Sequence, residues 1–564
     1  MSPESPAQKR EVVRKRSGWR RLRRFVWNTF ALLIIVAALA AGFVQLGLPW
    51  LERNPQRVEQ WLSERLQRPV TIGSVSSRWL RGGPQLALNN VVIGAATTSG
   101  TPLQLERAAL ALNLFAPFQR NGAWNEFRLG GLELSLVRGD DGQWSLRGLD
   151  LPSAPANDDD GLGALGALVL TDLLVHIDDP KRDIKLDLAA SELRLINRSN
   201  GPRVLGKIQR SGGSNPPLDL VIDSSPDRRS GNAWLGGRDL DLANLLNALP
   251  LDRIRVDKAN GAIDVWASWS DASLRDVSMK FDLARVRLQR TDVDTLPPVA
   301  LDALSGVARF RLDRDGWDLD VADWRLTQPG LSASQPAQFA LRRRGEPARW
   351  VAGADRVDIA GLAPLATLAP GVPDGLRSWL AEAEPQGVLD QPQIHFDSAA
   401  SYRLSTGFSG LAARAVGRKP GLSAVSGSIV GDAQATLISL PPQSLQLEFP
   451  GALRSPLRYS RIGGDIVAWR GEDGWHIEAT PIDFEGDGYG GQLRGGVAFP
   501  PDRSKPSLDV ALALQKAELG AAKLFWSASA PPKALNWLDN AFQGGSINAN
   551  AVFRGNLDDF PFQN

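Results

Sequence analysis

Residues 507–518 read Ser-Leu-Asp-Val-Ala-Leu-Ala-Leu-Gln-Lys-Ala-Glu, with leucine or valine at positions 508, 510, 512 and 514. Large apolar side chains at every second position are typical of a β-strand whose two faces meet different surroundings. Here one face is apolar throughout, while Asp509 lies on the other. Antiparallel sheets with one face in water have this pattern. We therefore expect residues 507–518 to form a strand of an antiparallel sheet.

The same period of two recurs along the chain from Val70 onward, so the expected fold is mainly β. A change of phase between Phe281 and Leu288 indicates a β-bulge near Ala284. Asp-Gly loops that precede a tryptophan predict hairpin turns before Trp317 and Trp475, and a third before Trp144. Further alternating segments are Leu132-Leu134-Leu136, Leu186-Leu188 and Leu445-Leu447-Phe449.

Three segments break the alternation in a similar way. After residues 239–243, 356–360 and 517–521 comes a short leucine-rich stretch, and then a glycine opens the next strand, at Gly261, Gly387 and Gly545. This predicts short helices that cross from one strand to the next. We divide the chain into a basic tail (1–24), a membrane anchor (25–48), an N-terminal β unit (49–152), a loop (153–163) and three β repeat units (164–260, 261–386 and 387–564).

A transmembrane helix is predicted near the N-terminus. Residues 1–24 carry nine lysines and arginines against two glutamates, and residues 25–48 have no polar side chain from Phe30 to Val44. This stretch has the length of about 20 residues that a helix needs to cross a bilayer, and the positive flank orients its N-terminus to the cytoplasm. The alternative is a signal peptide cleaved at Ala38-Leu39-Ala40. Both interpretations place the body outside the cytoplasm.

A short helix is expected to follow the anchor. Asn54-Pro55 is a typical helix start, and Val58, Trp61, Leu62 and Leu66 recur at helical spacing up to Pro69. Packing of this apolar face on the first strands is the simpler interpretation, and contact with a membrane surface is the alternative.

Composition excludes several kinds of chemistry. The 564 residues include no cysteine, which excludes disulfides and thiolate metal sites. Beyond residue 24 the net charge is −5, so the body lacks the basic footprint of a nucleic-acid-binding protein and we expect no nucleic-acid partner. Gly486-x-Gly488-x-x-Gly491 has dinucleotide-site spacing, but the strand-like Gln492–Val497 follows it instead of a helix, which favours a turn.

The three histidines are the remaining candidates for catalysis or metal binding. Each is followed two residues later by an acid, as in His176-x-Asp178, His395-x-Asp397 and His476-x-Glu478. Apolar neighbours occupy the inward phase of each strand, which turns the histidines to solvent on three remote strands. We expect no catalytic, cofactor-binding or metal-binding residue, no cofactor and no enzymatic activity.

The apolar strand faces are the strongest functional signal. The expected helices are too few to cover them, so either two sheets face each other in a sandwich, or one curved sheet leaves an apolar trough. An open trough would suit lipid acyl chains. The candidate groove residues are Leu132, Leu134, Leu136, Leu186, Leu188, Leu445, Leu447, Leu508, Val510 and Leu512.

Two motifs resemble a known family. Trp61-Leu62-x-x-x-Leu66-x-Arg68-Pro69-Val70-x-Ile72-Gly73, with Trp79 and Leu86-x-Leu88-x-x-Val91, resembles the opening of AsmA-like proteins. Trp537-Leu538-x-x-Ala541-Phe542-x-x-Gly545, with Gly555-x-Leu557-x-Asp559-Phe560-Pro561-Phe562, resembles the YhdP branch of that family. The similarity extends over nearly the whole chain after the anchor.

The resemblance implies an inner-membrane protein of a Gram-negative bacterium, with a cytoplasmic N-terminus and a periplasmic body. That body would be a long, twisted antiparallel β-sheet, an elongated trough or open barrel, which conducts phospholipids between the inner and outer membranes. Members of this branch are longer, so we expect the chain to be an N-terminal portion, with outer-membrane contact made by a further C-terminal part. The alternative is a structural tether or an outer-membrane assembly factor with a packed core and no lipid.

Overall fold

The computed structural model describes residues 49–556 and the single positions 27, 32, 35 and 42. Gaps in the described range fall at 67–68, 81–82, 95–102, 113–124, 140–143, 148–166, 182–183, 199, 248–252, 272, 294–295, 503–504, 526–529 and 542–543. The basic tail, the loop 153–163, the Asp141-Gly142 turn, the Leu557–Phe562 motif and nearly all of the span 25–48 lie outside the described residues. No helix within the described part is both long and apolar enough to cross a membrane.

The chain forms two compact units, one of residues 1–179 and 187–211 and the other of residues 180–186 and 212–564. The boundaries expected at 260 and 386 both fall inside the second unit. The division of that unit into repeats therefore stays a prediction. The elements of the first unit are α2 (Pro55–Leu66), β1 (Val70–Leu80), β2 (Gly83–Ile93), β3 (Leu103–Leu112), β4 (Asn125–Gly130), β5 (Glu133–Arg138), β6 (Trp144–Arg147), β7 (Ala167–Asp179), most of β8 (Ile184–Ile196) and β9 (Arg203–Arg210).

One part of the first unit departs from the expected antiparallel sheet. Strands β1 to β4 pair antiparallel in succession, as do β5 with β6 and β8 with β9. Strand β7, however, pairs in parallel with both β4 and β5. Residues 148–166 separate β6 from β7, which is long enough for the crossover that a parallel pair requires. Alternation within a strand does not report its direction, so this pairing was not predictable.

The first unit has a packed hydrophobic core. Leu132 and Leu134 are only 3% and 9% exposed, in a cluster that includes Val58 of helix α2. Helix α2 starts at Pro55 as predicted, and its Val58 and Leu62 pack on the cluster. Trp61 was expected on that apolar face, but it is 58% exposed, because residues 58 and 62 already occupy the contact with the strands.

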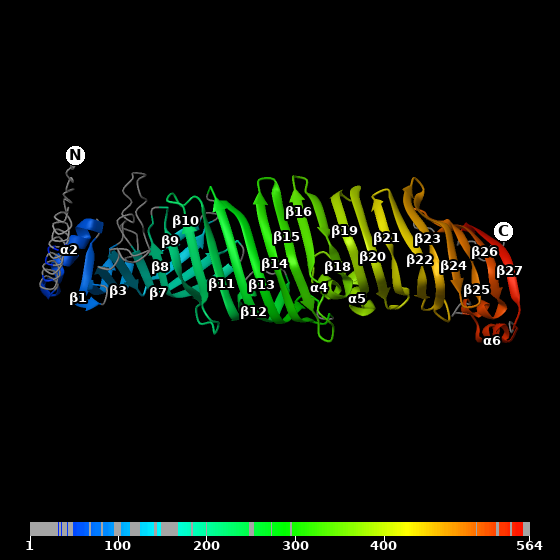
Figure 1. The fold of residues 1–564 in the computed structure, drawn as a ribbon, viewed down its shortest axis with the longest axis horizontal. Helices are drawn as coiled ribbons and strands as arrows, with labels where there is room; N and C mark the ends of the chain where they lie inside the picture. The colour runs from blue at the N-terminus through cyan, green and yellow to red at the C-terminus, as the bar shows by residue number, and fades with distance from the viewer. Residues whose placement is uncertain are drawn as a thin grey trace, which may run out of the picture. The chain divides into compact units, whose positions relative to one another are not determined.

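The second unit is one open antiparallel sheet in which successive strands pair from β10 to β27, except that β17 and β18 both pair with β19 (Figure 1). Its strands are β10 (Leu218–Ser224), β11 (Gly231–Asp241), β12 (Ile254–Ser270), β13 (Ser273–Arg290), β14 (Val299–Asp313), β15 (Gly316–Thr327), β16 (Ala337–Arg344), β17 (Arg349–Ala354), β18 (Arg356–Asp358), β19 (Gln386–Ser398), β20 (Ser401–Ala413), β21 (Gly421–Asp432), β22 (Ala435–Glu448), β23 (Leu457–Gly471), β24 (Gly474–Gly486), β25 (Tyr489–Phe499), β26 (Ser507–Glu518) and β27 (Ser546–Asn556).

Short helices lie at three of the connections, as predicted. They follow β11, β18 and β26. These three strands run in the same direction, so all three connections leave from the same side of the sheet, where the strands end. Figure 1 shows α4, α5 and α6 along that side. The helices are α3 (Ala243–Leu246), α4 (Ile359–Ala366), α5 (Asp374–Ala383), the 3-10 helix η2 (Leu519–Phe525) and α6 (Pro532–Ala541). Side chains from α3 and from the α4 region complete two small hydrophobic clusters there.

Local turn and bulge signals are confirmed. Strands β14 and β15 pair up to Asp313 and Gly316, which leaves a two-residue loop, and β23 and β24 are joined in the same way before Gly474. Arg285 has a φ of 54°, and the β12–β13 register shifts between the Lys258–Arg287 and Asn260–Ala284 pairs, which places the bulge next to Ala284. The glycine-rich Gly486–Gly491 segment is the turn between β24 and β25.

Candidate functional site

Cross-strand register aligns the apolar side chains of the second unit into one row across the whole sheet. Starting from Ile222 on β10, each residue pairs with the next as far as Gly555 on β27. We call this the central apolar row. Its residues are Ile222, Ala233, Ala267, Val277, Phe310, Leu319, Leu341, Ala352, Ile394, Leu404, Gly431, Thr436, Ala468, Ile477, Val497, Leu508 and Gly555. None of them is charged.

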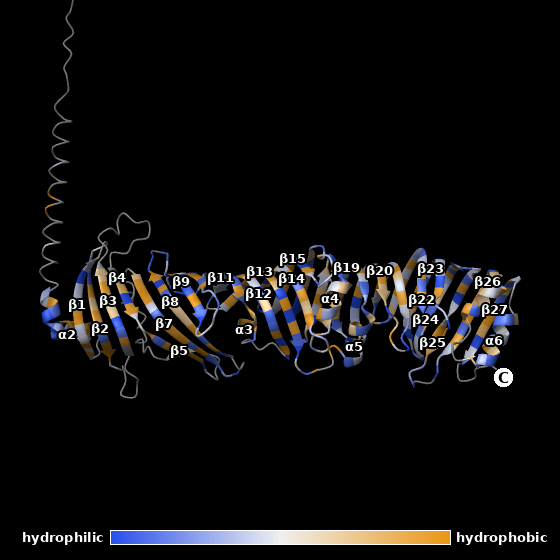
Figure 2. Ribbon diagram, turned by 90° about the horizontal axis from the view of Figure 1, so that it is seen from below, coloured by the Kyte–Doolittle hydropathy of each residue, from blue (hydrophilic) through white to orange (hydrophobic). Residues whose placement is uncertain are grey.

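Parallel rows widen this surface into an apolar face. On one side of the central row, Thr406, Ile429, Ile438, Ile466, Ala479, Gly495, Val510 and Phe553 pair in succession. Along β26 the face includes Leu508, Val510, Leu512 and Leu514, which span roughly 20 Å at about 3.3 Å per residue. Across the strands, with a spacing of about 4.8 Å, the central row extends for roughly 75 Å. Figure 2 shows the alternation as orange and blue bands along the strands.

The opposite face of the same sheet is polar. The residues next to the central row pair as Asp276, Arg311, Asp318 and Arg342. Ion pairs connect this polar face, with 2.6 Å between Arg309 Nε and Asp276 Oδ2, between Arg311 Nη2 and Asp320 Oδ2, and between Arg344 Nη2 and Asp318 Oδ1. Between β13 and β16 this face is therefore charged and hydrated, whereas between β21 and β22 it also carries the exposed side chains of Val430 and Leu437.

The apolar face is open to solvent between the helical connections. Ile394 and Ile477 of the central row are each 40% exposed, although a closed core would bury them. Other large side chains of this face are exposed as well, namely Phe396, Trp475, Phe499 and Phe553. The sheet is therefore open, which decides between the trough and the sandwich for the second unit.

Two cavities lie where helices approach the apolar face. One of about 240 Å³ lies between β15, β16 and α4, with Trp324 and Phe339 in its wall. The other, of about 290 Å³, lies between β25, β26 and η2, beside Tyr489 and Phe525, whose ring centroids are 5.2 Å apart. Burial raises the pKa of Tyr489 to about 12, and its hydroxyl donates to the carbonyl of Arg458 at 2.9 Å. Both cavities thus extend the apolar face at the strand ends where the helices lie.

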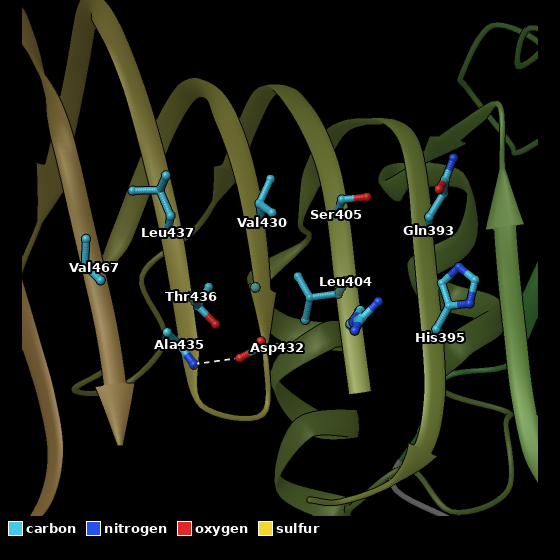
Figure 3. A pocket seen from close by; sticks show the side chains of 12 residues that line it. Gln393, His395, Leu404, Ser405, Val430, Asp432, Ala435, Thr436, Leu437 and Val467 are labelled. Carbon is cyan, nitrogen blue, oxygen red and sulfur yellow. Dashed lines mark hydrogen bonds between the residues drawn. The ribbon is translucent and has the colours of Figure 1, made fainter. Parts of the chain in front are cut away.

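A larger depression, of about 520 Å³, lies on the polar face and was not predicted (Figure 3). Its lining includes a cross-strand row from β19 to β23: Gln393, Ser405, Val430, Leu437 and Val467. At its rim, the backbone N–H groups of Gln434 and Ala435 donate to Asp432 at 2.9 Å, and these bonds lower the pKa of that carboxyl. Asp432 therefore stabilises the β21–β22 turn.

The histidines lie on three different strands, His176 on β7 of the first unit and His395 and His476 on β19 and β24 of the second. His176 contacts Asp187 at 2.6 Å and Glu133 at 2.9 Å, and these hydrogen bonds raise its pKa. His395 is exposed on the polar face of the second unit, where His476 stacks on Trp469 and contacts Asp473 at 2.8 Å. The partners of His176 and His476 are thus different from the acids two residues later in sequence. Among the described residues, no cluster of metal-ligating side chains occurs.

The ten predicted groove residues fall into different environments. Leu508, Val510 and Leu512 lie on the open apolar face and are half-buried. Leu445 is buried and pairs with Tyr459 of β23 across the strands, and Leu447, two residues later on β22, is half-buried. Leu136, Leu186 and Leu188 are half-buried. Leu132 and Leu134, in contrast, are buried in the hydrophobic cluster of the first unit.

Sequence reasoning missed most of the central apolar row. Ile394 and Ile477 were recognised only as inward neighbours of histidines, because a single strand does not reveal its register with the next strand. The sequence signal that could have identified the row is the absence of charged residues at alternate positions in successive strands.

Comparison with known proteins gives consistent results. The family described as YhdP protein matches residues 14–564. The curated protein "Intermembrane phospholipid transporter YhdP" of Escherichia coli (strain K12) is 23% identical over 586 residues, covering 96% of this chain and 44% of that protein. The chain therefore spans less than half the length of this relative. No solved structure matches the chain.

Proposed function

Because the chain belongs to the YhdP protein family, we propose that it conducts phospholipids, with the acyl chains lying on the apolar face of the second unit. The similar protein from Escherichia coli is named as an intermembrane phospholipid transporter, and that name supports a route between the inner and outer membranes. The proposal involves no catalytic step and no cofactor.

The central apolar row is the observation that supports this function most. A buried methylene group gains about 0.8 kcal/mol over one in water, so a lipid tail moves readily only where apolar contact is continuous. The row supplies such contact from β10 to β27, with one residue on each strand except the short β18. An acyl chain is about 15 Å long, half of a hydrocarbon core of about 30 Å, and the apolar face is roughly 20 Å wide along β26.

Anchoring in the inner membrane belongs to the same proposal. Residues 25–48 would cross the membrane once, with the basic tail in the cytoplasm and the two units in the periplasm. The length and hydropathy of that segment support the arrangement. Contact with the outer membrane would require sequence beyond the part of the relative that this chain matches.

A second candidate is a structural tether or assembly factor that carries no lipid. The core of the first unit favours it, because Leu132 and Leu134 are enclosed with Val58 and leave no open surface there. On the lipid-conducting account, the first unit is a folded base and only the second unit contacts acyl chains.

Photo-crosslinking separates the two candidates. A photoreactive amino acid at position 510 or 394, on the apolar face, is expected to form phospholipid adducts in cells. Position 509 on the polar face of β26 and position 134 in the first core are the matched controls, and we expect no adduct there. Well-folded protein without adducts at 510 and 394 would favour the structural candidate.

A further inference from the structure

Helix α2 forms the outermost layer of the first unit. It runs antiparallel to the edge strand β1 and accepts hydrogen bonds from the free edge of that strand. The N–H of Val70 donates to Ser63 Oγ at 2.9 Å and the N–H of Ile72 to Glu59 Oε1 at 2.7 Å. Just before the helix, Glu52 accepts from the N–H of Ser77, and its pKa is lowered by that contact. The strand side of this layer is thereby occupied, and its other side is the end surface of the unit.

That end surface carries aromatic and basic side chains without protein contacts to explain them. Trp50 and Trp61 are 54% and 58% exposed, and Trp79, near the end of β1, is 49% exposed. The antiparallel order brings Trp79 and Trp50 to the same end of the layer. Arg53 and Arg57 are exposed too, and the charge of Arg53 lies close enough to Glu52 to lower the pKa of that carboxyl.

A single exposed tryptophan needs no explanation, but Trp61 on α2, Trp50 just before it and Trp79 near the end of the neighbouring β1, together with exposed arginines, define an interaction surface. Tryptophan rings favour the headgroup level of a bilayer, and guanidinium groups bind lipid phosphates. We infer that the outer side of α2 docks on a bilayer containing anionic lipids, with the helix axis in the membrane plane.

The geometry of the chain supports the in-plane orientation. This inference rests on the proposed anchor, whose end at residue 48 leaves at most about 7 Å of extended chain before Trp50. An upright helix would carry Trp61 about 16 Å further from the membrane, at about 1.5 Å per residue. The headgroup layer is only about 5–8 Å thick. An in-plane helix keeps Trp50, Arg57 and Trp61 within that layer together.

The absence of cysteine allows a direct test in the full-length chain, reconstituted in vesicles of phosphatidylethanolamine and phosphatidylglycerol. A Gln60→Cys variant carries an environment-sensitive fluorophore on the exposed side of α2, and Ser398→Cys, in the β19–β20 hairpin of the second unit, is the control. Quenching by headgroup-labelled nitroxide lipids is expected to be several-fold stronger at 60 than at 398. The combined Arg53→Gln, Arg57→Gln and Trp61→Ala changes should reduce the signal at 60 to the control level.

Equal quenching at 60 and 398 would overturn the docking inference. Resistance to alkaline extraction, measured on the same vesicles, reports separately on the anchor. An extractable protein would disprove membrane spanning, whereas the quenching at 60 would still report on docking.

Discussion

The central apolar row contains no charge, and on the proposed function a single carboxylate there would hold water on the path of an acyl chain. A chain of about 16 carbons gains roughly 12 kcal/mol from apolar contact, at about 0.8 kcal/mol per methylene. Small residues are tolerated in the row, since Ala352, Ala468 and Gly555 leave its continuity intact. The neighbouring positions on the polar face carry Asp, Arg and His freely, for example Asp276 and Arg311.

Aspartate substitutions should separate the packed core from the open face. Leu134→Asp buries an unpaired carboxylate at a position that is 9% exposed, and should lower the free energy of unfolding by about 3 kcal/mol or more. Val510→Asp leaves its carboxylate hydrated and should change that free energy far less. Thermal unfolding and steady-state protein levels measure the difference. Equal losses of stability would contradict an open second unit.

Protonation of His176 should stabilise the first unit at acidic pH. Its pKa is raised by the hydrogen bonds to Asp187 and Glu133. The stabilisation is therefore fully present below the unfolded pKa of about 6.5 and is lost as pH rises through the folded pKa. His176→Gln should lower the unfolding temperature at about pH 6 and have little effect at about pH 9. With His395→Gln as control, a loss of the same size at both pH values would refute this assignment.

At the scale of elements, a glycine with positive φ follows each helical connection. Gly387 and Gly545 lie at the starts of β19 and β27, but Gly261, expected to open a strand, lies inside β12, which begins at Ile254. Gly261 has a φ of 153°, and a Cβ there would lie 2.0 Å from the carbonyl oxygen of Asp282. This is the close approach between β12 and β13 at the bulge after α3. Side chains larger than hydrogen have no room at this point.

Gly261→Ala should therefore destabilise the second unit, by roughly 2 kcal/mol or more. Gly353→Ala in β17 is the matched control, because the nearest atom to its added Cβ would be 3.6 Å away. Denaturant unfolding compares the two variants. A Gly353→Ala variant as unstable as Gly261→Ala would mean that backbone crowding is not the cause.

The elements themselves were largely predictable, because their signals are local. The alternation of apolar and polar residues predicted β26 and its neighbours. The change of phase predicted the bulge beside Ala284, and Asn54-Pro55 predicted the start of α2. Properties that depend on distant segments were not predictable. They include the parallel direction of β7, the exposure of Trp61 and the burial of Leu134, which all depend on which segments meet.

At the scale of the whole molecule, the two units differ in kind. The first has a packed cluster of apolar side chains contributed mainly by its strands, and the second leaves an apolar face open. Among the described residues, short helices lie at three connections of the second unit and approach only part of that face. Lipid contact is therefore expected only along the second unit.

The topology that this account requires is testable with reporter fusions. A reporter active only in the periplasm, fused after residue 100, should be active because the basic tail retains the N-terminus in the cytoplasm. Substitution of the tail's arginines by glutamine should reduce that activity. Activity of a cytoplasmic reporter alone at the same position would refute the proposed orientation.

The measurement that tests the central claim most directly is phospholipid transfer by a matched pair of alanine variants. Ala468 lies in the central apolar row on β23, and Ala498 lies on the polar face of β25; both are half-buried. Ala468→Asp places a hydrated carboxylate on the proposed path, so several methylenes would have to cross water, and the rate of transfer should fall about tenfold or more. Ala498→Asp, at equal protein level, should transfer phospholipid at the unaltered rate. Equal rates for both variants would contradict conduction along the apolar row.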